Sequence, residues 1–251
     1  PIQNAIKGHT GNISMQEVLT YSLNTGSIQA LRLLGGSETE ITYQGKEKLY
    51  DYYYNRFGLG KYTGIELAES KGTVIPPTDI DGTNARYANM TFGQSLDLTM
   101  IQVATAFSAV VNGGDYYTPT LVAGEIKNGE FVRNVLKERD HQAIESSTSE
   151  TMRKMLHTAR LVFPNVKYYD EGVYVGGKTG TAQVVKNGKY TFDETTATYI
   201  GYGARSETDY PEYVIMTKVW EDNRSLDGGM DAKPIFDEIS QFMVNYLKMR
   251  R

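Results

Sequence analysis

The first part of the chain carries apolar side chains at the spacing of amphipathic helices. Ser14, with Glu17 three residues later, has the pattern of a capping box and predicts a helix that ends near Tyr21. The segment Asn24–Ser27 is expected to begin a second helix. The tripeptide Ser22-Leu23-Asn24 therefore falls in the elbow between two helices.

The helical pattern continues, with one interruption, to about residue 114. The second helix should stop at Gly35-Gly36, and a third, rich in tyrosine, is expected over Glu47–Phe57. Residues 61–90 contain several glycines and prolines and predict an irregular connection. Thr99 is expected to cap a buried helix that ends at Gly113-Gly114. The residues expected on its core face are Met100, Val103, Ala104, Phe107, Val110 and Val111.

The pattern changes from helix to sheet in the second half. Leu121–Ile126 and Phe131–Leu136, on either side of Asn128-Gly129, predict a hairpin. A helix is expected over Ser149–Val162, where four apolar residues share one face. They are Met152, Met155, Leu156 and Ala159.

Three strands and a helix are expected to close the chain. The strands are predicted at Val173–Val185, Thr196–Ala204 and Tyr213–Trp220, with a turn at Asn187-Gly188 after the first. Strands that follow one another in sequence favour an antiparallel meander. A last helix from Pro234 to about Lys248 places on one face Ile235, Ile239, Phe242, Met243 and Tyr246.

Helices followed by a terminal sheet predict an α+β fold, an antiparallel sheet flanked by helices. We expect residues 1–251 to be one portion of a single domain, with a helical part over about 1–163 and a closing sheet and helix over about 173–251.

Composition narrows the function classes. The net charge of -4 gives no electrostatic footprint for nucleic acid, so that class is set aside. The chain has no cysteine, and its three histidines share no metal-binding spacing, so no metal site is predicted. Its longest apolar stretch, Ile101–Val111, is too short to span a bilayer. The start at Pro1-Ile2-Gln3-Asn4 has no initiator Met, and the chain is expected to be part of a longer protein.

The strand at Gly176–Gln183 carries the main candidate chemistry. Lys178, Thr179, Gly180 and Thr181 combine a cation, two hydroxyls and a residue without a Cβ, which suits an anionic, peptide-like ligand. Lys-Thr-Gly is one of three motifs of the serine acyl-transfer enzymes that penicillin inactivates, and Ser-x-Asn is another. A given tripeptide occurs by chance about once in twenty chains of this length, so Lys-Thr-Gly alone is weak evidence. Several motifs in the same order along the chain are more specific.

That ordered set resembles the C-terminal part of the transpeptidase domain of class B penicillin-binding proteins, over nearly the whole chain. Ser22-Leu23-Asn24 after Gly8–Gly11 resembles the family's second motif. The run from Phe92-Gly93-Gln94 to Gly113-Gly114 resembles its central helix. The closing sheet and helix are similar in Gly177–Gln183, Tyr199–Tyr202, Gly228-Gly229 and Ala232–Phe236. The resemblance implies a penicillin-binding transpeptidase or serine β-lactamase-like fold.

It also implies roles for individual residues. Ser22 would relay a proton to the leaving group, and Asn24 would position the substrate amide and hold a catalytic lysine. Lys178 would add positive charge near Ser22. Thr179 and Thr181 would bind the substrate carboxylate, and the Thr181 N–H would be an oxyanion donor. Gly180 would let the ligand lie against the strand, and Ala182 and Gln183 would complete the substrate-binding segment.

Each of these residues also has a purely structural interpretation. Ser22 and Asn24 are both good helix caps, and the residues from Lys178 to Thr181 could form a solvated strand face. None of the thirteen serines is followed by lysine at the third position, so the Ser-x-x-Lys motif that supplies the family's nucleophile is absent. We expect it upstream of Pro1, together with a membrane anchor and the first strands of the sheet. The chain alone is then expected to be inactive.

The resemblance implies a peptidoglycan D,D-transpeptidase at the extracytoplasmic face of the bacterial cell membrane. Its expected partners are peptidoglycan stem peptides, β-lactam antibiotics, the N-terminal part of the same protein and membrane proteins of cell-wall synthesis. No cofactor is implied. The alternatives are a serine β-lactamase, which shares the motifs but hydrolyses its acyl-enzyme, and a non-catalytic β-lactam sensor or scaffold.

Overall fold

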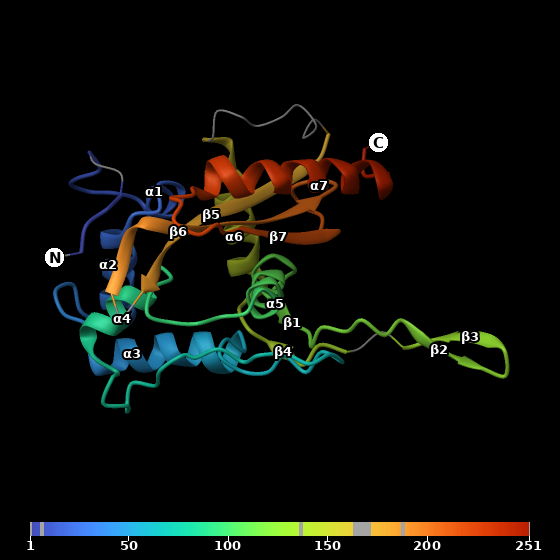
Figure 1. Cartoon of the computed structure of the whole chain (residues 1–251), viewed down its shortest axis with the longest axis horizontal. Helices are drawn as coiled ribbons and strands as arrows, with labels where there is room; N and C mark the ends of the chain where they lie inside the picture. Colours follow the sequence, from blue (N-terminus) through green and yellow to red (C-terminus); the bar gives the residue numbers. More distant parts are fainter. Residues whose placement is uncertain (1, 6–7, 136–137, 163–171, 187–188, 251) are drawn as a thin grey trace.

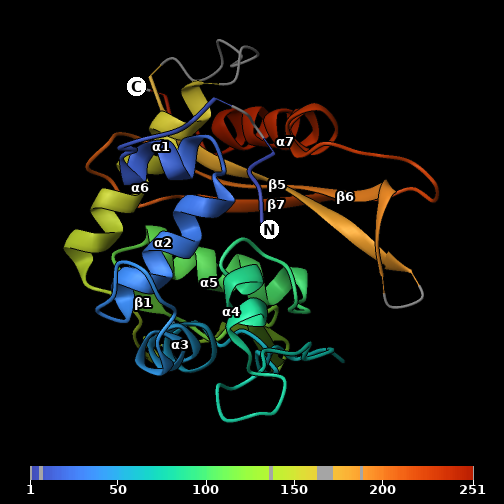
Figure 2. The same ribbon diagram turned by 90° about the vertical axis from the view of Figure 1, so that its left-hand side faces the viewer.

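A computed structural model describes residues 2–5, 8–135, 138–162, 172–186 and 189–250. It has the predicted α+β architecture, with one three-stranded antiparallel sheet and helices on both of its sides (Figure 1). Figures 1 and 2 show α7 on one side of this sheet and α2, α3, α4 and α5 on the other.

The first two helices form the predicted elbow. Helix α1 spans Met15–Thr20, and its capping box is present: the Ser14 hydroxyl accepts a hydrogen bond from the Glu17 N–H, and the Glu17 carboxylate accepts one from the Ser14 N–H. Helix α2 spans Asn24–Leu34 and ends at Gly35, as expected. Local capping signals therefore set the start of α1 and the end of α2.

The third helix begins earlier than the sequence pattern indicates. Helix α3 spans Tyr43–Tyr50 because the Thr42 hydroxyl caps it, accepting a hydrogen bond from the Gly45 N–H at 3.1 Å. It continues as the π-helical segment η1, Asp51–Arg56.

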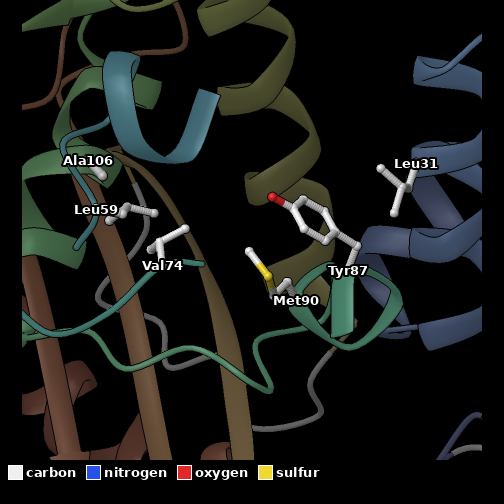
Figure 3. Packing of buried hydrophobic residues seen from close by; sticks show 6 residues of the cluster. All are labelled: Leu31, Leu59, Val74, Tyr87, Met90 and Ala106. Atoms are coloured by element: carbon white, nitrogen blue, oxygen red, sulfur yellow. The ribbon is translucent and has the colours of Figure 1, made fainter. Parts of the chain in front are cut away.

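The expectation that residues 61–90 are irregular throughout is wrong for their last part. Helix α4 spans Asn84–Met90, and the Thr83 hydroxyl caps it. Tyr87 and Met90 of this helix are fully buried, so its stability comes from packing and from the cap rather than from a long periodic pattern. Figure 3 shows them in the helical core with Leu31, Leu59, Val74 and Ala106.

Helix α5, Met100–Val111, is present as predicted, and Val111 of the expected core face is fully buried, but its other buried residues lie on a different face. Met100 is 41% exposed, whereas Gln102, Thr105, Ala106, Ala109 and Val111 are buried. Gln102 is the reason: its side-chain amide donates to the carbonyls of Lys61 and Lys71 and accepts from the Gly60 N–H. A buried polar group that satisfies three backbone groups turns this face inward.

Two small sheets follow α5. Strand β1, Asp115–Tyr116, pairs with β4, His141–Gln142. The predicted hairpin is confirmed with shorter strands, β2 at Gly124–Lys127 and β3 at Glu130–Arg133, and it projects from the body in Figure 1. Asn128 and Gly129 have φ angles of 52° and 85°, which the tight turn requires.

The predicted meander is confirmed. Strands β5 (Tyr174–Lys186), β6 (Lys189–Ala204) and β7 (Tyr213–Val219) are antiparallel in the order β5-β6-β7. Strand β6 begins seven residues before the predicted start, and the turn predicted at Asn187-Gly188 lies outside the described residues. The β5–β6 ribbon extends beyond β7, which pairs only with Ala197–Gly203.

Two helices cover opposite faces of this sheet. The Tyr202 hydroxyl donates to the Arg153 carbonyl in α6, Ser146–Leu161, whereas a Cβ on the adjacent Gly201 would contact Phe236 of α7. Because neighbouring strand residues point to opposite faces, α6 and α7 sandwich the sheet.

Helix α7, Lys233–Tyr246, follows the π-helical segment η3, Gly228–Ala232. Most of the apolar face seen in the sequence does not pack on the sheet: Ile235, Ile239, Phe242 and Tyr246 are 41–70% exposed. Met243 is the residue of that face that packs against the core, beside Tyr213 of β7. The buried face contains Phe236 and Val244 with Asp237, which bonds Arg160 of α6 at 3.2 Å and Lys233 at 2.6 Å. Paired charges let this mixed face be buried.

Candidate active site

The structure brings together two motifs that are 156 residues apart. The ammonium group of Lys178 on β5 donates a hydrogen bond to the Ser22 hydroxyl in the elbow between α1 and α2. The same Nζ atom donates to the Thr179 carbonyl at 3.0 Å and to the Thr179 hydroxyl at 3.2 Å. A cation, two hydroxyls and an edge strand therefore meet at one point.

Close packing of the two helices shapes the elbow. A Cβ on Gly26 would overlap the side chain of Val18, so glycine allows α2 to lie directly against α1. Ser22 has a φ of 52°, in the left-handed region, and its side chain is exposed. The next residue, Leu23, is 1% exposed and anchors the turn in the core. The elbow thus holds a serine outward on a strained backbone.

Neither Ser22 nor Asn24 acts as a helix cap. The N-cap of α2 is Leu23, and it makes no side-chain capping bond. The structural interpretation of these two residues as caps is therefore wrong. The Asn24 side chain lies in the first turn of α2 and donates to the Gln3 carbonyl at 2.9 Å.

Glycines on β5 make room for aromatic rings of β6. A Cβ on Gly176 would lie 2.5 Å from the Tyr202 ring, and one on Gly177 would lie 2.5 Å from the Tyr199 hydroxyl. A Cβ on Gly180 would lie 2.5 Å from the Thr198 hydroxyl oxygen. The structure therefore gives Gly180 a role in strand packing, in addition to the close ligand approach expected from sequence.

The pKa of the Lys178 amine differs from that of an ordinary lysine. Burial lowers its pKa from the ordinary 10.5 to about 8, because desolvation favours the neutral amine, while the charge of Asp227 acts in the opposite direction. An amine with this pKa can both hold and release a proton near neutral pH.

A groove of about 860 Å³ runs past these residues. Its walls include Ser22, Asn24 and the β5 residues from Lys178 to Thr181. The rest of its lining is largely apolar, and the helices contribute Leu19, Leu31, Leu34, Leu49, Met152 and Met155. An apolar groove with a few convergent polar groups is the usual form of a ligand site. Ala182 and Gln183 continue β5 beyond the lining residues, opposite Thr196 and Thr195 of β6.

Asp227, a polar residue that lines the groove, was not identified as a site residue from the sequence. The Thr181 hydroxyl donates to the Asp227 carboxylate at 3.4 Å and accepts from the Gly228 N–H at 3.1 Å. Asp227 also caps η3, since its Oδ1 accepts from the N–H groups of Gly229 and Met230 at 2.8 and 3.1 Å. An aspartate before two glycines is a turn or capping signal, and only the fold shows that it reaches β5.

Within the ranges given above, no three His, Cys, Asp or Glu side chains are grouped so that they could hold a metal ion. In the same part of the chain, every helix is too short or too polar to cross a membrane.

Comparison with known proteins agrees with this geometry. The penicillin-binding protein transpeptidase domain family matches residues 2–241. Stage V sporulation protein D of Bacillus subtilis is 33% identical over 237 residues, which are 93% of this chain and 34% of that protein. Penicillin-binding protein PbpB of Mycobacterium tuberculosis is 27% identical over 80% of this chain and 30% of its own length. The chain therefore spans about a third of these relatives.

Solved structures show the same fold. Penicillin-binding protein 3 of Mycobacterium tuberculosis in complex with ampicillin has a TM-score of 0.77 at 23% identity, over 98% of this chain and 54% of that chain. The transpeptidase domain of penicillin-binding protein 3 from Burkholderia pseudomallei has a TM-score of 0.75 at 20% identity, over 96% of this chain and 66% of that chain. With the groove, the Lys178–Ser22 contact and the family match in place, the chain belongs to the penicillin-binding protein transpeptidase domain family.

Proposed function

We propose that this chain forms the substrate-recognition side of a peptidoglycan D,D-transpeptidase. It binds D-alanyl-D-alanine stem peptides and β-lactams, and an acyl-serine from an upstream part of the same protein completes the reaction. The main support for this proposal is the contact between Ser22 and Lys178, which lies on the edge strand β5.

Strand β5 offers a template for a peptide. In the described sheet it pairs only with β6, so its other edge can accept an extended ligand strand beside Gly180 and Thr181. The Thr179 and Thr181 hydroxyls and the Lys178 ammonium then receive the ligand carboxylate through charge-assisted hydrogen bonds. The Thr181 N–H stabilises the oxyanion that forms when serine attacks the scissile carbonyl.

Ser22 and Lys178 act as the proton carrier. With a pKa of about 8, Lys178 is present in both protonation states near neutral pH, and its hydrogen bond to Ser22 gives the hydroxyl a proton source and acceptor. Ser22 passes the proton to the leaving amine, and Asn24 orients the substrate amide and holds the lysine that follows the nucleophile.

The proposed setting is the outer face of the bacterial cell membrane, where peptidoglycan stems are cross-linked. Partners there are the upstream part of the protein and membrane proteins of cell-wall synthesis.

Replacing Lys178 in the complete protein tests this function. We expect Lys178→Met to abolish cross-linking of stem peptides and to slow acylation by penicillin by about 100-fold or more, as loss of an acid–base group does. Lys218→Met is the matched control, since Lys218 is an exposed residue of β7 in the same sheet, away from the groove residues.

Cross-linking that survives Lys178→Met would refute the site assignment. The fate of the penicilloyl adduct on the unmodified protein separates the enzyme classes: slow release supports a transpeptidase, and rapid turnover indicates a β-lactamase. Acylation without any cross-linking would indicate a sensor.

A further inference from the structure

The groove contains a fixed negative charge at the position proposed to receive a negatively charged ligand. Asp227 lines the groove with Lys178 and Thr181, and its Oδ2 accepts the hydrogen bond of the Thr181 hydroxyl. The proposed ligand carboxylate requires that same hydroxyl. The Asp227 carboxylate therefore already accepts the hydrogen bond that the ligand carboxylate would need from Thr181.

Asp227 cannot easily turn away from this position. Its Oδ1 accepts from the Gly229 and Met230 N–H groups and so caps η3, and its own N–H donates to the Asp231 carboxylate at 2.7 Å. Two bonds hold the side chain and one holds the backbone of Asp227, and rotation of the side chain would leave two backbone donors without their acceptor. The Oδ2 atom consequently remains directed at β5.

The electrostatic influence of Asp227 reaches across the groove. Its charge favours the protonated form of Lys178 and raises the pKa of that amine against the effect of burial. A second carboxylate bound between Lys178 and Thr181 would experience the same field as repulsion.

We propose that Asp227 determines specificity in this site by competing with the ligand carboxylate for Thr181 and Lys178. The residue lowers the affinity for carboxylate-terminated ligands relative to neutral analogues of the same shape. This inference rests on the proposed function, because that function makes β5 the carboxylate-binding element.

Asp227→Asn in the complete protein is the appropriate change. Asparagine keeps the capping oxygen and the size of the side chain but removes the charge. Asp231→Asn is the matched control, because it removes an equal charge four residues away and Asp231 has no bond to Thr181. Two ligand pairs are used: penicillin and its methyl ester in acylation, and N-acetyl-D-alanyl-D-alanine and its C-terminal amide in an NMR titration.

We expect Asp227→Asn to raise the affinity of the carboxylate dipeptide relative to its amide, and the acylation rate of penicillin relative to its methyl ester, by about 3-fold, the scale of an exposed charge pair. Ratios are compared because loss of Asp227 also lowers the pKa of Lys178, which affects both members of each pair. The gain should disappear at about 1 M salt, where charges are screened within about 3 Å. Asp231→Asn should have less than half of the effect.

An equal change for carboxylate and neutral ligands, or none for either, would overturn the inference. The titration does not require acylation, so it keeps the two proposals separate. A protein that binds the dipeptide but is never acylated contradicts the transpeptidase function alone, and the ratio of dipeptide to amide affinities still decides the role of Asp227.

Discussion

At the scale of single residues, Lys178 is governed by two opposing effects. Its partial burial favours the neutral amine, and Asp227 favours the charged one, with burial the larger effect. The result is a pKa of about 8 in the folded chain against 10.5 for an ordinary lysine. The folded state therefore binds the Lys178 proton less tightly than the unfolded state does.

This difference predicts a pH-dependent stability. Between about pH 8 and 10.5 the unfolded chain holds the Lys178 proton and the folded chain does not, so the free energy of unfolding should rise with pH in this range. Below pH 8 both states are protonated and the cost of the buried charge is present in full. We expect the stability of the unmodified protein relative to Lys178→Met to increase by on the order of 2 kcal/mol from pH 7.5 to 10.

Urea denaturation at several pH values measures the difference in the free energy of unfolding between the unmodified protein and Lys178→Met. Other titrating groups are common to both proteins and cancel in the comparison. A difference between the two proteins that does not vary with pH would mean that Lys178 keeps an ordinary pKa.

At the scale of elements, the position of β5 depends on its contact with η3. A Cβ on Gly228 would lie 2.6 Å from the carbonyl oxygens of both Gly180 and Thr198. These are backbone atoms of two paired strands, so they cannot move without disturbing the ladder. Gly228 thus sets how closely the segment with Asp227 approaches the ligand-binding strand.

We expect Gly228→Ala to destabilise the protein by about 1–3 kcal/mol, as overpacking of a tight contact does. Because the same overlap displaces the backbone of Gly180 in the proposed ligand-binding strand, penicillin acylation of the complete protein should also slow. Met230→Ala is the control, since Met230 belongs to the same segment and is 73% exposed. Thermal unfolding and acylation rates together test this, and a Gly228→Ala protein with unchanged stability would disprove the tight contact.

Elements were predicted well where the signal is local. The capping pairs Ser14–Glu17 and Thr42–Gly45 lie within one turn, although only the first was recognised in the sequence. The buried faces of α5 and α7 were predicted only in part, because the partners of Gln102 and Asp237 are distant in sequence. Periodicity identifies an apolar stripe, but the stripe of α7 is exposed and its ion-paired face packs on the sheet.

At the scale of the whole molecule, the site is built from three regions that are far apart in sequence. The elbow, strand β5 and the segment before η3 meet in one groove. Ser22 and Lys178 could be selected because each lies in a motif of an ordered set that resembles a known family. Asp227 could not, since its importance arises from the folding of residues 221–227 back onto β6, where the Thr195 hydroxyl accepts from the Leu226 N–H at 2.6 Å.

The same whole-molecule view predicts how the chain behaves alone. Acylation by penicillin needs an activated serine, and in this family the activating lysine follows that serine by three residues, a pattern that none of the thirteen serines here shows. The Ser22–Lys178 pair does not replace it, because we propose that this pair carries the proton to the leaving amine. We therefore expect this chain by itself to form no covalent adduct with fluorescent penicillin on a denaturing gel, whereas the complete protein should be labelled. Labelling of the isolated chain that is lost in Ser22→Ala would instead make Ser22 the nucleophile and reverse the assignment of the proton carrier.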